Sequence, residues 1–96
     1  MTNLSPLMSI AIRPDIIFTR GSGSYMWDEK SNKYLDFIQG WAVNCLGHSP
    51  AVLVDAIAAQ ARTLINCSPA FYNQPMSELA DLIATHSCFD RVFFAN

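Results

Sequence analysis

Charged residues are scarce in this 96-residue sequence. Only 15% of its residues are Asp, Glu, Lys or Arg, against about 25% in a typical soluble domain. The six Lys and Arg residues are scattered singly along the chain, so they form no basic patch of the kind that nucleic-acid binding requires. Because the formal net charge is also slightly negative, at −2, nucleic acid is not an expected partner.

Metal-binding and membrane-spanning patterns are lacking too. The cysteines Cys45, Cys67 and Cys88 show neither Cys-x-x-Cys spacing nor a nearby histidine pair, so free thiols are predicted rather than zinc ligands. No hydrophobic run approaches the roughly 18 residues of a membrane span, and residues 1–12 show no pattern of a secretory signal. We therefore expect a cytoplasmic chain with no metal site and no membrane contact.

Hydrophobic residues, by contrast, make up 51% of the sequence. A domain of this size buries only about 60 to 65% of its unfolded surface, so much of this apolar surface must lie exposed at an interface or await a missing partner. Residues 91–96 form an apolar run that predicts a strand buried on both faces, and no further strand follows it. We expect the chain to be part of a larger α/β domain.

Hydrophobic and polar residues alternate through residues 14–40 with a period of two, which predicts β-strands. Turn-forming residues interrupt the alternation at 21–23 and 28–32. The segment therefore predicts a three-stranded antiparallel meander, and residues 40–48 predict an irregular loop after it. The alternating hydrophobic positions are Ile16, Phe18, Tyr25, Trp27, Leu35 and Phe37.

Two helices are predicted after this loop. Ser49 as N-cap and Pro50 at the first helical position mark the start of one helix, and Asn73 followed by Pro75 marks the start of the other. Pro69 disfavours helix at the residue before it, so the connection between them is a loop. The apolar stripes of the two helices consist of Leu53, Ile57, Ala61 and Leu64, and of Met76, Leu79, Ala80 and Ile83.

Few residues indicate chemistry by themselves. Gly21-x-Gly23 is a turn rather than a dinucleotide-binding fingerprint, because Met26 stands at the third glycine position and no helix begins there. His48 is a lone histidine, for which a hydrogen-bonded structural role is favoured over that of a general base. The residues alone therefore identify no catalytic group.

Two aromatic segments leave alternatives open. Trp41 lies in a loop directly after a predicted strand, where it could line a pocket, because loops at the ends of rigid elements carry many sites. It could equally fill a core or an interface. Phe71-Tyr72-Asn73 presents the same choice, with packing at a subunit or domain boundary favoured.

Six motifs in register resemble a known family. Together they are similar to the N-terminal part of class III aminotransferases over about residues 13–96, and most similar to members that act on acetylornithine. The motifs are Arg13 to Ile16, Gly23 to Asp28, Lys33 to Phe37, Gly40 to His48, Ser68 to Asn73 and Phe93 to Asn96.

The resemblance implies an α/β fold of the fold-type I class, with α+β character at the N terminus. Residues 1–13 would form an N-terminal arm. Residues 14–48 would form the meander and the pocket loop, as part of the small domain. Residues 49–96 would form a helix-loop-helix-strand segment that begins the large domain, and the chain would stop in the first strand of that domain.

The resemblance also implies an enzyme that uses pyridoxal 5′-phosphate (PLP), works as a homodimer and transfers an amino group between N2-acetylornithine and 2-oxoglutarate in arginine biosynthesis. The family's phosphate-binding turn begins just after the position of Asn96, and its cofactor-bearing lysine lies further downstream. Lys30 and Lys33, exposed in and beside a hairpin turn, cannot replace that lysine. The chain by itself is therefore expected to hold no catalytic or cofactor-binding residue, to bind no PLP and to be inactive without the remainder of the aminotransferase.

The same resemblance implies a limited set of site residues. The loop Gly40 to Asn44 resembles the family loop that approaches substrate, so Trp41 is the first candidate to contact the side-chain end of the amino donor, and Val43 and Asn44 are weaker candidates. The segment from Ser68 resembles a stretch at the dimer interface. Its candidate partner-facing residues are Phe71, Tyr72 and Asn73.

Two departures from the family pattern bear on these expectations. Ser31 stands where much of the family has glycine, so Asn32 is expected to adopt the left-handed conformation instead. The second histidine of the family motif Gly-His-x-His-Pro is missing after His48, which argues against a catalytic role there. Ornithine, succinylornithine and 4-aminobutyrate transaminases share much of the pattern. Half of a split enzyme and a non-catalytic dimerising module are further alternatives.

Overall fold

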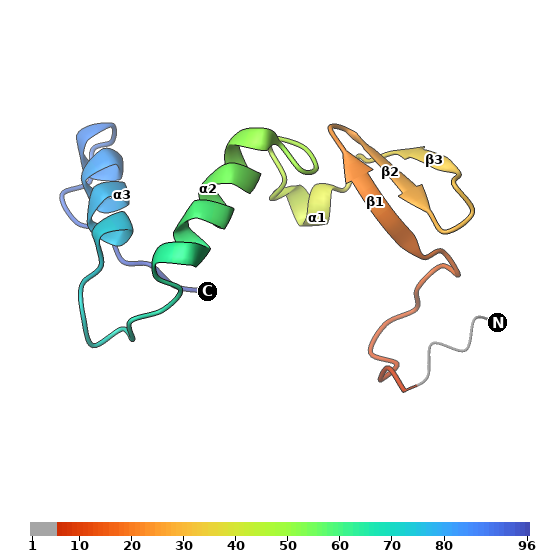
Figure 1. The fold of residues 1–96 in the computed structure, drawn as a ribbon, viewed down its shortest axis with the longest axis horizontal. Helices are drawn as coiled ribbons and strands as arrows, with labels where there is room; N and C mark the ends of the chain where they lie inside the picture. The colour runs from red at the N-terminus through yellow and green to blue at the C-terminus, as the bar shows by residue number, and fades with distance from the viewer. Residues whose placement is uncertain (1–5) are drawn as a thin grey trace. The chain divides into compact units, whose positions relative to one another are not determined.

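The computed structural model of the chain describes residues 6–96 (Figure 1). The chain divides into two compact units, residues 1–57 and residues 58–96. The first unit holds a small sheet and a short helical turn, the second holds a helix and the C-terminal segment, and another helix crosses the boundary. Residues 1–5 of the expected N-terminal arm lie outside the described residues.

The sheet is the predicted antiparallel meander. Its strands are β1 (Phe18–Ser22), β2 (Tyr25–Asp28) and β3 (Lys33–Leu35), in the spatial order β1-β2-β3. The register pairs Met26 with Gly21 on one side and with Tyr34 on the other. The alternation of the sequence is thus confirmed as strand structure, although the strands are shorter than the alternating segment.

The turn between β2 and β3 is built around the carboxylate of Asp28, which is only 7% exposed. Its Oδ1 accepts hydrogen bonds from the backbone N–H groups of Lys30 and Asn32 at 2.9 and 2.8 Å, and its Oδ2 accepts from Asn32 Nδ2 and the Tyr34 hydroxyl. Ser31 adopts the left-handed conformation, with φ 64°. The expectation that Asn32 would do so is wrong, because both of its N–H groups are committed to Asp28.

Helix α2 (Ala51–Thr63) and helix α3 (Gln74–Thr85) correspond to the two predicted helices. Helix α2 begins one residue later than expected, and the carbonyl of Pro50 accepts bonds from the N–H groups of Leu53 and Val54. Asn73 caps α3 as predicted, since its Oδ1 accepts from the Met76 N–H at 3.0 Å. Neither helix is long and apolar enough to span a bilayer, and the same holds for every helix within residues 6–96.

Residues 91–96 differ from the expected strand. They carry no assigned secondary structure, because a strand is defined by its ladder partners and none of the described strands pairs with this segment. Val92, Phe93 and Phe94 instead line one side of a cavity of about 340 Å³, with Tyr72, Met76 and other residues of unit two on the other sides.

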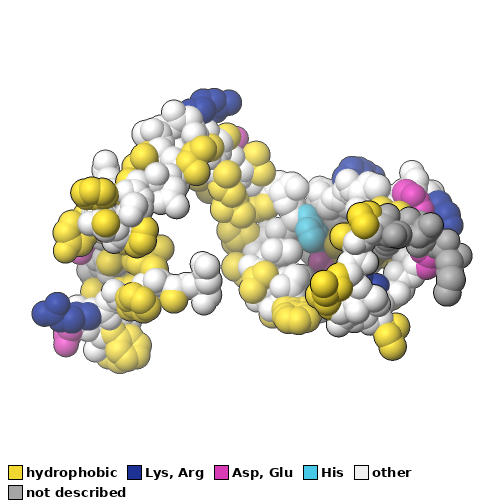
Figure 2. Space-filling model, turned by 90° about the horizontal axis from the view of Figure 1, so that it is seen from below, with side chains coloured by type: hydrophobic (Ala, Val, Ile, Leu, Met, Phe, Trp, Pro, Cys, Tyr) yellow, Lys and Arg dark blue, Asp and Glu magenta, His cyan; other side chains and the backbone are white. Residues whose placement is uncertain are grey.

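Hydrophobic side chains remain at the surface in both units, as Figure 2 shows in yellow. Among the described residues no hydrophobic side chain is buried, and the only buried side chains are those of Asp28 and Asp36. The apolar stripe of α2 illustrates this, since Leu53 and Ile57 are 47% and 59% exposed. The elements therefore form as the sequence predicts, while their apolar faces have no covering layer within this part of the chain.

Candidate functional site

The loop after β3 has an unusual backbone. Its single helical turn, α1 (Gln39–Ala42), has left-handed backbone angles, with φ values of 53° at Gln39, 60° at Gly40, 70° at Trp41 and 61° at Ala42. Non-glycine residues rarely adopt this conformation, and each such residue costs roughly 1 to 2 kcal/mol. Backbone strain of this kind persists only where the surrounding structure holds it in place.

The carboxylate of Asp36 is one of the groups that hold this turn. Its Oδ1 accepts from the backbone N–H groups of Ile38 and Gln39 at 2.9 and 2.8 Å, and its Oδ2 lies 2.6 Å from His48 Nε2. Asp36 is 5% exposed. The pKa of this carboxyl lies below its ordinary value, mainly because it accepts a hydrogen bond from the Gln39 N–H and also because it is hydrogen-bonded to the His48 ring. One side chain thus joins the start of the loop to its end.

His48 also ties the loop to the hairpin between β1 and β2. Its backbone N–H donates to the Gly23 carbonyl at 2.8 Å, and the Gly23 N–H donates back at 3.1 Å. A Cβ at Gly21 would lie 2.6 Å from His48 Cγ, so the ring sits directly against that glycine. The expected hydrogen-bonded role of His48 is confirmed. The turn predicted at residues 21–23 is wrong for Gly21, which lies in β1 and pairs with Met26, because the chain reverses only at Gly23 and Ser24.

The anchored loop presents Trp41 to the outside, with 90% of its surface exposed. Val43 is 70% exposed and Asn44 is half-buried. Asn44 contributes through its backbone, because its N–H donates to the Gln39 carbonyl and its carbonyl accepts from the Gly47 N–H. Trp41 therefore fills no core within the described residues, and its indole is available to a ligand or to another part of a larger protein.

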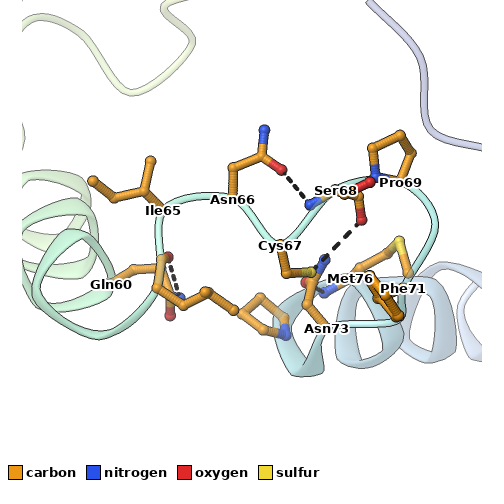
Figure 3. Close-up of a pocket in the computed structure, with 11 residues that line it drawn as sticks. Gln60, Ile65, Asn66, Cys67, Ser68, Pro69, Phe71, Asn73 and Met76 are labelled. Atoms are coloured by element: carbon orange, nitrogen blue, oxygen red, sulfur yellow. Dashed lines mark hydrogen bonds between the residues drawn. The ribbon is translucent and has the colours of Figure 1, made fainter.

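Two of the three predicted partner-facing residues lie at a pocket within residues 60–76 (Figure 3). The pocket has a volume of about 410 Å³, and both Phe71 and Asn73 line it. Phe71 and Tyr72 are 67% and 90% exposed, and Tyr72 faces the separate cavity beside α3. The Cys67 thiol contributes weak hydrogen bonds to the carbonyls of Ser68 and Tyr72.

The exposed residues of these loops could be predicted from the sequence, but the carboxylate that shapes the first loop could not. Asp36 lies at the end of the third predicted strand without any sequence pattern that marks it as a site residue, whereas the structure joins it to His48, twelve residues later. The only signal in the sequence was the combination of a carboxylate at a strand end with a histidine beside a glycine. That combination fixes no distance, so the pair could not be found without the fold.

Comparison with known proteins decides the family. Residues 10–96 match the family model described as Aminotransferase class-III. The chain belongs to the class III aminotransferases. Acetylornithine aminotransferase of Ralstonia nicotianae is 61% identical over 94% of this class III chain, and acetylornithine aminotransferase 2 of Bordetella bronchiseptica is 55% identical over 97% of it. These alignments cover 23% and 24% of the two relatives.

A solved structure supports the same assignment. The acetylornithine aminotransferase of Elizabethkingia anophelis superimposes with a TM-score of 0.82 at 31% identity, covering 88% of this chain and 22% of that one. The fold is accordingly that of the N-terminal segment of a fold-type I aminotransferase, with the mixed α/β content that the sequence predicts. This class III chain spans about a quarter of the length of its relatives.

PLP is the cofactor that membership of the class III family implies for the parent enzyme, and the two lysines of this sequence are Lys30 and Lys33. Lys33 is engaged elsewhere, with Nζ 3.9 Å from the ring centroid of Tyr25 and 5.7 Å from that of Trp27. Lys30 lies exposed in the turn held by Asp28. No cluster of three potential metal ligands occurs within residues 6–96.

Proposed function

We propose that this chain forms the N-terminal segment of a transaminase that moves an amino group between N2-acetylornithine and 2-oxoglutarate, as a step of arginine biosynthesis. The observation that carries the proposal is the 61% identity to a protein named acetylornithine aminotransferase, extending over 94% of the chain. Identity this high over nearly the whole segment favours a shared substrate. The alternative donors of the family remain as outcomes of the test.

In this proposal the strained loop is a wall of the substrate pocket. Trp41 contacts the side-chain end of the amino donor, because its indole is exposed and its backbone is held. Val43 and Asn44 flank that contact. The aromatic loop of the second unit faces a partner subunit in a homodimer, an assignment that its exposed apolar surface supports; its residues are Phe71, Tyr72 and Asn73.

The remaining length of the protein supplies the cofactor site in this proposal. PLP provides the chemistry of amino-group transfer, while the residues described here bind and orient the donor and exclude water from one side of it. Residues 14–48 would belong to the small domain and residues 49–96 to the large domain. We also propose that the enzyme works in the cytoplasm.

A chimera tests the proposal. The matching N-terminal segment of the Ralstonia nicotianae enzyme is replaced by this chain, and the purified chimera is assayed for PLP content, for oligomeric state and for transamination with 2-oxoglutarate. We expect a PLP-loaded dimer whose kcat/KM for N2-acetylornithine lies within about tenfold of that of the parent, a difference of about 1.4 kcal/mol.

The donors ornithine, N2-succinylornithine and 4-aminobutyrate serve as comparisons in the same assay. A PLP-loaded dimer that transfers no amino group from N2-acetylornithine would contradict the proposal. Faster turnover of one of the other donors would reassign the substrate within the family.

A further inference from the structure

The bond between His48 and Asp36 joins both ends of the strained loop that carries Trp41. All four residues from Gln39 to Ala42 have positive φ values, and only one of them is glycine. The buried polar side chain beside this loop is that of Asp36, at its start. Asp36 uses one oxygen for the loop's first N–H groups and the other for His48 at its end. A strained segment with both ends fixed by one carboxylate is held in a single conformation.

The surrounding glycines point to the same arrangement. Gly21 leaves room for the His48 ring, which a Cβ would meet at 2.6 Å. Gly47 adopts φ 80°, and a Cβ there would lie 2.8 Å from the Gly23 carbonyl oxygen. The two reciprocal backbone bonds between Gly23 and His48 then fix the end of the loop to the sheet.

We propose that His48 and Asp36 are positioning residues that hold the Trp41 loop in its strained conformation and thereby set recognition of the amino donor. The proposal rests on the proposed function, since it assigns the donor contact to Trp41. Neither residue touches the substrate in this account. Their effect passes through the backbone of residues 38–42 to the indole.

A double-mutant cycle in the chimera separates positioning from general destabilisation. His48→Ala is expected to raise KM for N2-acetylornithine about tenfold, with kcat changed less than about threefold, because the loss lies in donor binding. In the Trp41→Ala background the same substitution should change KM by less than about twofold, since coupled residues are not additive. His86→Ala, at the exposed end of α3, is the matched control and should leave both constants unchanged.

Amide hydrogen exchange gives a second readout that needs no activity. The N–H groups of Ile38 and Gln39 should exchange about tenfold faster in the His48→Ala chimera, while those of α2 keep their rates. Unchanged exchange at these two amides would overturn the proposal, and so would equal KM effects in both backgrounds of the cycle. If the chimera without substitutions is inactive, that result counts against the proposed function alone. The amide exchange rates of Ile38 and Gln39 then decide whether His48 and Asp36 hold the loop.

Discussion

Asp28 and Asp36 are the two buried carboxylates of the described chain, and each organises a turn with backbone N–H donors. The sequence shows both as residues at strand ends, which predicts a turn but no particular partner. Their partners lie up to twelve residues away, and only the folded meander brings these groups together. The exposed residue Trp41 could be predicted as a site residue from its position in a loop. The hydrogen bond between Asp36 and His48 that holds this loop could not.

The lowered carboxyl pKa values predict how acid affects these turns. The Asn32 amide lowers the pKa of Asp28, and the Gln39 N–H lowers that of Asp36, from an ordinary 3.8. Because the unfolded carboxyls take up protons first as the pH falls, the stabilisation is complete above 3.8 and is lost as the pH drops through the lowered pKa values. Carboxyl ¹³C shifts in a segmentally labelled chimera should titrate with midpoints below 3.8.

The variant Asn32→Ala is the control for this titration. It removes the largest cause of the shift at Asp28 and should raise that midpoint alone, leaving the midpoint of Asp36 in place. Midpoints at or above 3.8 for both carboxyls would show that the turns are not built as described.

The glycines of the first hairpin give a matched pair of substitutions. Gly21→Ala places a methyl group 2.6 Å from the His48 ring, whereas an added Cβ at Gly23 meets nothing within 4 Å and bears only the strain of φ 56°. We expect Gly21→Ala to displace the ring and to speed exchange of the Ile38 and Gln39 amides, while Gly23→Ala leaves those amides near their parent rates. Equal effects of the two substitutions would contradict the close packing of His48 on Gly21.

At the scale of elements, local signals predicted most of the secondary structure. The alternation of hydrophobic residues in the meander and the capping residues of the helices are both local in sequence. These two signals therefore predicted strands β1 to β3 and helices α2 and α3. The strand predicted at residues 91–96 is not formed, because a strand also needs a hydrogen-bonded neighbour and none of the described strands pairs with this segment. The left-handed turn of α1 was predicted only as irregular, since four successive positive φ values have no sequence signature.

The N-cap of α3 supplies a prediction at this scale. Asn73→Ala removes the acceptor of the Met76 N–H, at a cost of about 1 kcal/mol to the first turn of the helix, and the Met76 amide should exchange about fivefold faster. Asn73→Asp retains an acceptor and should keep the slower rate. Exchange that is equally slow in both variants would show that the cap does not hold the helix start.

For the molecule as a whole, family membership and the exposed apolar surface both indicate that this chain is part of a larger domain. The helices α2 and α3 form without burying any side chain among the described residues, and the relatives are about four times as long as this chain, which covers 23% and 24% of them. Length and composition predicted this need for a larger domain. The residues of this chain do not show which other part of a larger protein covers the apolar faces of α2 and α3.

Turnover of N2-acetylornithine by the chimera is the measurement that decides whether this chain supplies the donor-facing segment of an acetylornithine-type transaminase, as we propose. We expect a PLP-loaded dimer with kcat/KM within about tenfold of the parent enzyme. A folded, PLP-loaded chimera that leaves N2-acetylornithine unreacted would contradict it.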